Sequence, residues 1–341
     1  MTHRRNVLKA AIVSTMALNL SLNSSNSIAG VGNNNHQVTN AKPKRLKQGD
    51  TIGLIAPSTN VMEDEAIYFA KDILLSFGFK VKFAKHLFDR FGYLAGKDRD
   101  RAADLNQMFA DKSVDAIFCL RGGYGSPRML PYLDYDLIAN NPKVLIGYSD
   151  VTALLNAIYA RTGLITFHGP LAHQSFTEYT LKNFKKVLFE ANKNIQLAAP
   201  PPFEIVEGQA EKDNRLTVIS PGVAKGKLIG GNLSLMVKLV GTPYEPDYKG
   251  KILILEDVEE QPYRIDGMLT HLLLAGRLSQ VVGIVFGKCS DCKASGNSLS
   301  IEQVIRDRLG DLNIPVLKGM MIGHIDDMAT LPIGAMATLD A

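Results

Sequence analysis

Short, nearly continuous apolar runs alternate with segments of helical periodicity through the first half of this 341-residue chain. The first run is TIGLIA at 51–56, and apolar residues then recur at helical spacing up to Phe77, just before Gly78. Further strand candidates lie at 80–83, 114–120 and 144–147. Apolar runs of this length are typical of strands buried on both faces of a parallel sheet. The alternation therefore predicts an α/β fold, with a parallel sheet and helices on both of its faces.

Three consecutive prolines, Pro200–Pro202, interrupt the chain after a helix expected over 181–191. Proline continues neither a helix nor a central strand. We therefore expect a linker over 193–214, between an N-terminal α/β domain over 49–192 and a C-terminal domain over 215–341. The second part is richer in short strands and glycines, which predicts a smaller, barrel-like α/β domain.

The first 29 residues have the pattern of an export signal. A basic head with Arg4 and Arg5 precedes an apolar stretch over 10–22, and a small-x-small cleavage site follows at 27–29. The run RRNVLK resembles the twin-arginine export signal, while an ordinary secretory signal or an uncleaved anchor stays open. We expect a periplasmic protein, cleaved near Ala29, that begins with a flexible leader over 30–48.

Charge and cysteine content argue against several classes of function. Three of the 38 basic residues lie in the first 29 positions, which hold no acidic residue, so the rest carries 35 basic against 34 acidic residues. A nearly neutral chain offers no electrostatic attraction for nucleic acid. Cys289 and Cys292 have CxxC spacing, but a zinc site needs a second pair of ligands. We expect two loop cysteines without a catalytic role, with a local disulfide as the alternative in an oxidising compartment.

The segment VLIGYSD at 144–150 runs from a strand through a turn into a helix with a periodic apolar face. Ser149 therefore lies at the sheet edge where open α/β folds bind ligands, beside a helix N-terminus suited to stabilising an oxyanion. The G-x-S-x-G pattern of a nucleophile elbow is incomplete, because Val151 replaces its second glycine. On local pattern alone, capping of the helix by Ser149 or Asp150 is the commoner arrangement.

A glycine-rich loop, RGGYG at 121–125, follows the third strand candidate. Three glycines in four positions let a backbone approach a ligand closely and direct N–H groups toward it. A dinucleotide-binding fingerprint needs glycine three positions after Gly125, where Arg128 stands. The H-E-x-x-H run of metallopeptidases is missing too. We therefore expect no cofactor and no metal.

A serine nucleophile needs a base, usually histidine, which a carboxylate orients. His168 follows a strand-like segment, and His324 lies in a loop rich in glycine and methionine near the C-terminus. Sequence spacing leaves the choice between these two open. Glu256 ends the apolar strand ILIL, where an acid is costly unless it is paired or functional. The alternative for Glu256 is a solvated acidic turn.

The joint order of several short motifs resembles the LD-carboxypeptidase family, also called muramoyl-tetrapeptide carboxypeptidases, from about Gly53 to Gly334. The motifs are IAPS at 55–58, YLAG at 93–96, RGGYG at 121–125, GYSD at 147–150, FHGP at 167–170, GGNL at 230–233, LED at 255–257, PYRID at 262–266 and GH at 323–324. The resemblance implies an N-terminal domain similar to class I glutamine amidotransferases, a smaller C-terminal domain, and a homodimer.

The resemblance also implies a catalytic set of Ser149, Glu256 and His324, and so selects His324 as the base. Ser149 would attack the carbonyl of the diamino acid in a peptidoglycan tetrapeptide. His324 would carry the serine proton to the departing D-alanine, while Glu256 holds the imidazole.

An oxyanion hole is implied between the backbone N–H of Asp150 and the turn at Gly122 and Gly123. The planar fork of arginine suits the terminal carboxylate of a substrate. The candidate substrate-binding residues are Arg121, Tyr124, Asn232 and Arg264. For Arg264, a structural salt bridge to Asp266 is the alternative.

Two other functions stay open. The microcin C immunity peptidase resembles this chain in the same catalytic set but cleaves an aminoacyl-nucleotide, for which stacking aromatic residues are expected. This chain has no tryptophan and carries the pattern of an export signal, so we favour the wall peptide. A non-catalytic periplasmic protein that binds wall peptides is the alternative from another class. The intact catalytic set argues against it.

Overall fold

The computed structural model describes residues 41–190, 195–204 and 206–341. All of them belong to one compact unit, Val38–Ala341. The expected export signal over 1–29, its cleavage site at Ala29 and the leader up to residue 40 lie outside the described residues. Within the described ranges, no helix has both the length and the apolar character needed to cross a membrane.

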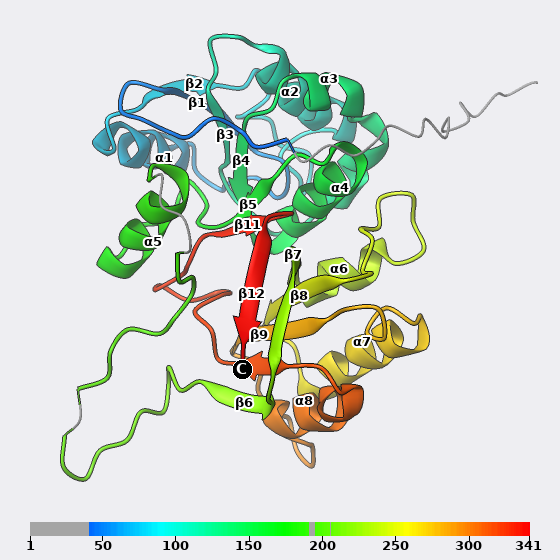
Figure 1. Cartoon of the computed structure of the whole chain (residues 1–341). Coiled ribbons are helices and arrows are strands. Elements are labelled where there is room, and N and C mark those ends of the chain that lie inside the picture. The colour runs from blue at the N-terminus through cyan, green and yellow to red at the C-terminus, as the bar shows by residue number, and fades with distance from the viewer. Residues whose placement is uncertain (1–40, 191–194, 205) are drawn as a thin grey trace, which may run out of the picture. The chain divides into compact units, whose positions relative to one another are not determined.

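The first sheet has six strands in the order β11-β5-β4-β3-β1-β2 (Figure 1). Five of them pair in parallel, as the alternation of strands and helices predicts. These five are β1 (Thr51–Ile55), β2 (Lys80–Phe83), β3 (Ala116–Cys119), β4 (Val144–Gly147) and β5 (Thr166–His168). The sixth, β11 (Leu331–Ile333), comes from near the C-terminus and pairs antiparallel with β5. The central strands β3 and β4 are buried throughout, because helices cover both faces.

Helices α1 and α5 lie on one face of this sheet, and α2, α3 and α4 lie on the other (Figure 1). Their bounds are α1 (Glu65–Ser76), α2 (Asp98–Ala110), α3 (Tyr135–Asn140), α4 (Thr152–Thr162) and α5 (Glu178–Leu188). Two short 3-10 helices, Ser126–Tyr132 and Ser149–Val151, follow β3 and β4. Helix α5 begins three residues earlier than expected, because the Thr177 side chain caps it by accepting from the Thr180 N–H.

The second sheet also has six strands, in the order β12-β7-β8-β9-β10-β6. Strands β7 (Val223–Asn232), β8 (Lys251–Val258), β9 (Gly283–Ser290) and β10 (Val316–Lys318) are parallel. The antiparallel strands β6 (Thr217–Ser220) and β12 (Met336–Asp340) form its edges. The sheet curls into a half-barrel, as expected for a barrel-like C-terminal part.

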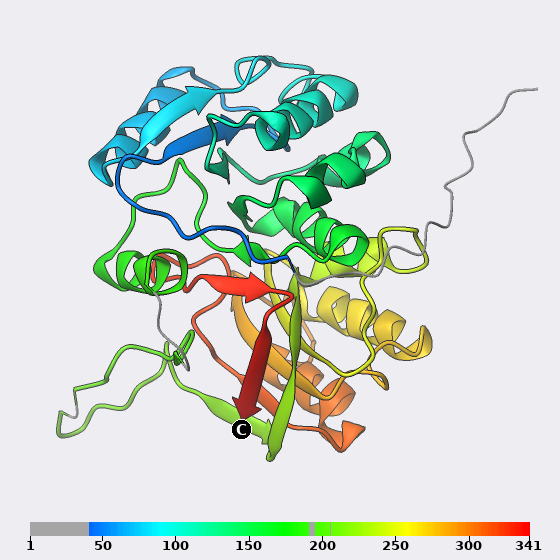
Figure 2. The same cartoon turned by 45° about the horizontal axis from the view of Figure 1, so that its top comes forward.

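Three helices, coloured yellow to orange, lie on one side of the second sheet in both views (Figures 1 and 2). They are α6 (Leu233–Leu239), α7 (Pro262–Leu274) and α8 (Ile301–Leu309), which a short 3-10 helix (Gly310–Leu312) extends. Each sheet has its own cluster of buried apolar side chains. The carboxyl ends of β4 and β8 carry the residues from which a site can be built.

Candidate active site

Ser149 directly follows β4 and Tyr148, and it adopts a strained backbone conformation. Its φ is +61°, in the left-handed region that residues with a side chain rarely adopt. Such strain recurs at functional sites, where the surrounding structure maintains it. A Cβ at Gly147 would lie 2.9 Å from Val151 Cγ1, so glycine at 147 makes room for valine at 151. The turn therefore has the geometry of a nucleophile elbow although its sequence pattern is incomplete.

Neither Ser149 nor Asp150 caps the helix that follows, so the commoner arrangement suggested by the local pattern is wrong. The Asp150 carboxylate instead accepts from the Ser126 N–H at 2.7 Å, and the Ser126 hydroxyl donates to the Asp150 carbonyl. Burial raises the pKa of Asp150, and the hydrogen bond from the Ser126 N–H opposes that rise. Asp150 thus ties the serine turn to the segment after the glycine-rich loop.

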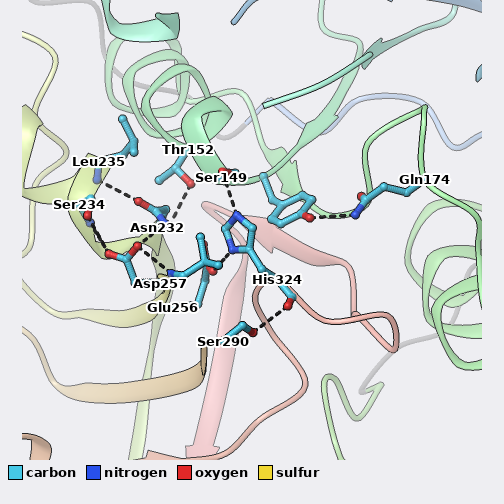
Figure 3. A network of polar contacts seen from close by, with 12 residues as sticks. Ser149, Thr152, Gln174, Asn232, Ser234, Leu235, Glu256, Asp257, Ser290 and His324 are labelled. Atoms are coloured by element: carbon cyan, nitrogen blue, oxygen red, sulfur yellow. Dashed lines mark hydrogen bonds and ion pairs between the residues drawn. The ribbon is translucent and has the colours of Figure 1, made fainter. Parts of the chain in front are cut away.

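His324 makes hydrogen bonds with both Ser149 and Glu256 (Figure 3). Its Nε2 lies 2.9 Å from Ser149 Oγ, and its Nδ1 lies 2.8 Å from Glu256 Oε2. A carboxylate only accepts, so Nδ1 carries the proton and Nε2 is free to accept from the serine hydroxyl. The three side chains form one chain of hydrogen bonds in which a base contacts a nucleophile and a carboxylate orients the base.

Burial and the contact between Glu256 and His324 act in opposite directions on the pKa of each group. Glu256 has no exposed surface, and burial raises its pKa, while the hydrogen bond from His324 opposes the rise. Burial by itself would lower the pKa of His324, but the hydrogen bond and charge of Glu256 outweigh it and raise that pKa. The Nδ1–H of His324 donates to Oε2 of Glu256, which favours the ionised form of the carboxyl group. A buried carboxylate held in this way stabilises the imidazolium that forms when His324 takes a proton.

His168, the other histidine that the sequence left open, contacts neither Ser149 nor Glu256 through a hydrogen bond. It is completely buried, and neither ring nitrogen has a hydrogen-bond partner within the described residues. Burial, together with the nearby His324, lowers its pKa to about 3. The Tyr148 ring lies 5.9 Å from the His168 ring and 4.8 Å from that of His324. His168 is therefore a neutral packing residue close to the site.

The glycine-rich loop lies against Ser149. A Cβ at Gly122 would lie 3.0 Å from Ser149 Cβ, closer than ordinary packing, so glycine favours this approach. Thr59 holds the loop, because its N–H donates to the Gly122 carbonyl at 3.2 Å and its hydroxyl accepts from the Tyr124 N–H at 2.9 Å. Gly123 lies between these two contacts at φ +105°. The loop thus presents its backbone beside the serine.

Comparison with known proteins shows to which family the chain belongs. Residues 52–169 match the LD-carboxypeptidase N-terminal domain, and residues 225–339 match the LD-carboxypeptidase C-terminal domain. The chain belongs to the LD-carboxypeptidase family.

Individual members are similar over most of their length. The probable murein peptide carboxypeptidase of Bacillus subtilis is 40% identical over 307 residues, which cover 88% of this chain and 92% of that protein. The structure of the microcin C7 self-immunity protein MccF matches with a TM-score of 0.79 at 30% identity, covering 87% of this chain and 95% of that one. The muramoyltetrapeptide carboxypeptidase from Oxalobacter formigenes matches with a TM-score of 0.73 at 30% identity, over 85% and 95% of the two chains.

The structure places the four candidate substrate-binding residues in different surroundings. Arg121 is half-buried, and its Nη1 donates to the Asn60 carbonyl at 3.2 Å. Tyr124 is exposed, with the Tyr93 ring at 5.4 Å and Lys238 Nζ 6.0 Å from its ring centre. The loop therefore combines a cation and an exposed aromatic ring within four residues of Gly122.

Asn232 and Arg264 are engaged by the protein itself. The buried Asn232 side chain caps α6 by accepting from the Leu235 N–H, and it donates to Asp257 Oδ1 at 3.0 Å (Figure 3). Arg264 is exposed, and its Nε lies 3.5 Å from a Glu260 carboxylate oxygen. The alternative salt bridge of Arg264 to Asp266 is not formed, since Asp266 lies 3.4 Å from Arg308.

The sequence did not reveal several polar residues around the triad of Ser149, His324 and Glu256. Asp257 accepts from the Ser234 hydroxyl at 2.8 Å and from its N–H at 3.0 Å, which fixes the start of α6. The Ser290 hydroxyl donates to the His324 carbonyl at 2.7 Å and so holds the histidine loop to β9. The sequence did contain a signal for the role of Asp257. A second acidic residue at the end of a buried strand also needs hydrogen-bond partners.

The described residues also include one group of possible metal ligands and a pair of neighbouring cysteines. In the part of the chain that the structure describes, one group of possible metal ligands comes together, His86, Asp89 and Asp100, on the surface. Its histidine is already hydrogen-bonded to Asp89 at 2.9 Å. Cys289 and Cys292 are free thiols that contact each other through a side-chain hydrogen bond.

Proposed function

We propose that this LD-carboxypeptidase cleaves the L,D bond between the diamino acid and the terminal D-alanine of peptidoglycan tetrapeptides, with Ser149 as nucleophile. The observation that carries the proposal is the unbroken chain of hydrogen bonds Ser149–His324–Glu256, at 2.9 and 2.8 Å. Family members named as murein peptide and murein tetrapeptide carboxypeptidases support the choice of substrate.

Acylation begins when the Ser149 hydroxyl attacks the carbonyl carbon of the diamino acid. His324 Nε2, already within hydrogen-bond distance, removes the hydroxyl proton. Its Nδ1–H stays bonded to Glu256, whose buried charge stabilises the new imidazolium. The attack forms a tetrahedral intermediate that carries a negative charge on the former carbonyl oxygen.

The proposed oxyanion hole lies between the Asp150 N–H and the turn at Gly122 and Gly123. The strained φ of Ser149 and the absence of a side chain at Gly122 let the serine and this turn come close together. Donors that are held in place before the reaction cost no reorganisation when the charge develops. Removing one such donor from an enzyme typically costs a factor of about 10²–10³ in kcat.

The intermediate collapses when His324 gives its proton to the amine of D-alanine, which leaves with the electrons of the broken C–N bond. A water molecule then attacks the acyl-serine, with His324 again taking a proton and returning it to Ser149. The products are a tripeptide and D-alanine, and the catalytic residues return to their starting state.

Arg121 is the better of the two arginine candidates for the D-alanine carboxylate. It belongs to the loop that contacts Ser149, and one hydrogen bond to Asn60 leaves other guanidinium donors for a ligand. Arg264 stays a candidate, although it lies beside Glu260 on exposed α7. Tyr124 is a candidate for contacts farther along the peptide, and Asn232 for lining the site.

A second candidate function is amide cleavage in an aminoacyl-nucleotide, as in a microcin C immunity peptidase. The observation that favours it is the structural match to MccF with a TM-score of 0.79. The exposed pair Tyr93 and Tyr124 offers aromatic surface for a base. The binding-protein alternative is weaker, because a ligand-binding role alone gives no reason for the strained serine or for the histidine and buried carboxylate that follow it in the chain of hydrogen bonds.

Mass spectrometry of the purified protein with L-Ala-γ-D-Glu-diaminopimelate-D-Ala tests the proposal. We expect loss of one alanine with the wild type and no loss with Ser149→Ala. The same peptide ending in L-alanine is the matched control and should stay intact. Release by Ser149→Ala would show that Ser149 is not the nucleophile. If the wild type left the tetrapeptide intact but cleaved an aminoacyl-nucleotide, the second candidate would replace the first.

The proposal also covers the cellular location and the oligomeric state of the protein. We propose that residues 1–29 direct the protein to the periplasm, where released wall peptides are its substrates, and that it works as a homodimer. Cell fractionation tests the first point, and a wholly cytoplasmic, uncleaved protein would contradict it. Light scattering tests the second, and a monomer at assay concentrations would contradict it.

A further inference from the structure

The side chain of Asn156, on α4, forms a bridge between the two sheets. It is completely buried, and its amide pairs with both polar groups of a single residue on β7. Asn156 Nδ2 donates to the Gly230 carbonyl at 2.9 Å, and its Oδ1 accepts from the Gly230 N–H at 2.9 Å. The amide thus occupies the place that a neighbouring strand would take beside β7.

Thr152 makes a second contact of the same kind one turn earlier on α4. Its hydroxyl oxygen accepts from the Asn232 N–H at 3.0 Å (Figure 3). Asn156 Nδ2 also donates to the Thr152 carbonyl at 2.8 Å, which fixes the rotamer of the amide. Two polar side chains on α4 therefore hold alternate residues at the end of β7.

This bridge connects the two parts of the triad. Thr152 follows Ser149 by three residues, so the bridge starts on the helix that continues from the nucleophile turn. At its other end, β7 pairs with β8 so that Asn232 lies opposite Glu256. The bridge therefore sets the distance between the serine and the strand that carries the orienting carboxylate.

Two glycines make room for the bridge. Gly230 and Gly231 have φ values of +115° and +133°. A Cβ on Gly231 would lie 2.7 Å from Thr152 Oγ1 and 3.0 Å from His168 Nδ1. Glycine at this position lets β7 approach α4 closely. This packing explains the two glycines of the GGN motif without any role in substrate binding.

We propose that Asn156 and Thr152 are positioning residues that hold Ser149 within reach of His324. The inference rests on the proposed function. A misplacement of about 1 Å between reacting groups can cost a factor of about 10² in rate. A buried amide that loses its hydrogen-bond partners has no water to replace them. The Asn156 amide is therefore held in a single orientation.

The test compares Asn156→Leu with Asn183→Leu. Asn183, on α5, donates to the Tyr179 carbonyl four residues back, as Asn156 does to the Thr152 carbonyl, and among the described residues its amide makes no hydrogen bond to the second sheet. The active sites are first counted by labelling with a fluorophosphonate, and kcat and KM for the tetrapeptide are then measured per labelled site. We expect kcat of Asn156→Leu to fall about 10- to 100-fold with KM within about twofold, and Asn183→Leu to keep wild-type kcat.

Thr152→Val and Thr152→Ser provide the second arm. Valine keeps the shape of threonine but lacks the hydroxyl acceptor, whereas serine keeps the hydroxyl. We therefore expect a lower kcat in Thr152→Val and a kcat near that of the wild type in Thr152→Ser.

The acid limb of the pH profile should stay in place in Asn156→Leu, because the Glu256–His324 hydrogen bond does not involve α4. A wild-type kcat per labelled site in Asn156→Leu, or an equal loss in Asn183→Leu, would overturn the proposal. If the wild type released no D-alanine, the proposed function would fail, and the labelling rate of Ser149 would still test the bridge.

Discussion

His324 Nδ1 lies 2.8 Å from Oε2 of Glu256, a side chain with no exposed surface. The contact joins the end of β8 to a loop 68 residues farther along the chain. It fixes the tautomer of the imidazole and directs the free electron pair of Nε2 toward Ser149. The protonation of this one pair controls how the site responds to pH.

Removal of the Glu256 charge should change both rate and pH dependence. His324 must be neutral to act as base, and its pKa is raised above the ordinary value, so wild-type kcat/KM should rise through an acid limb above about pH 6.5. Glu256→Gln removes the stabilising charge, so the limb should move to lower pH, and kcat should fall by a factor of about 10³–10⁴. Glu65→Gln, an exposed residue on α1, is the control. An unshifted limb in Glu256→Gln would mean that the pair does not govern the titration.

Replacement of Ser149 by glycine should stabilise the fold while abolishing activity. The φ of +61° costs a serine of order 1 kcal/mol, and glycine adopts this conformation without that strain. We expect Ser149→Gly to gain about 1 kcal/mol in the free energy of unfolding, seen as a rise of about 2 °C in Tm. Ser149→Ala, which is equally inactive, keeps the strain and should show no such gain. Equal Tm values for the two variants would argue against backbone strain at Ser149.

A methyl group at Gly122 should disturb the nucleophile more than the fold. Its Cβ would lie 3.0 Å from Ser149 Cβ and 3.3 Å from Ser149 Oγ, closer than ordinary packing. We expect Gly122→Ala to lower kcat at least tenfold, by analogy with the roughly 10²-fold cost of small displacements. Gly267→Ala, which adds a methyl group in open space on α7, should keep wild-type kcat. Steady-state kinetics of the two variants decide the point, and a fully active Gly122→Ala would show that the loop adapts.

Arg101 should contribute far more to stability than Arg128, although both contact Asp98. The buried Arg101 guanidinium donates to the Pro57 carbonyl, to the Gly125 carbonyl at 3.1 Å and to Asp98 at 2.6 Å. Arg101→Met leaves buried carbonyls without donors, and we expect a loss of about 3 kcal/mol in urea unfolding. Changing Arg128 to Met should cost clearly less stability, because its side chain is 41% exposed and solvent screens its ion pair with Asp98. Similar losses in both variants would refute this difference.

Much of the fold was determined by local patterns in the sequence. The parallel sheet followed from buried strand runs alternating with helical periods, because each element must bury its own apolar face. The tip position of Ser149 followed in the same way, since a strand and a helix meet within a few residues at 144–152. The association of β11 with the first sheet was not predicted, because a strand of three residues near the C-terminus shows too little pattern.

The pairing of distant residues was decided only by the tertiary structure. The local pattern around Ser149 favoured a helix cap over a nucleophile. The spacing of residues along the chain gave no reason to choose His324 rather than His168 as the base. The positions of Ser149 and His324 are 175 residues apart, and those of Asn156 and Gly230 are 74 apart. Such contacts depend on how two separately packed sheets are placed against each other, which the periodicity of any one segment does not record. Local patterns therefore specify which elements form and where the serine turn lies, whereas the contact of Ser149 with His324 depends on how the two sheets are placed.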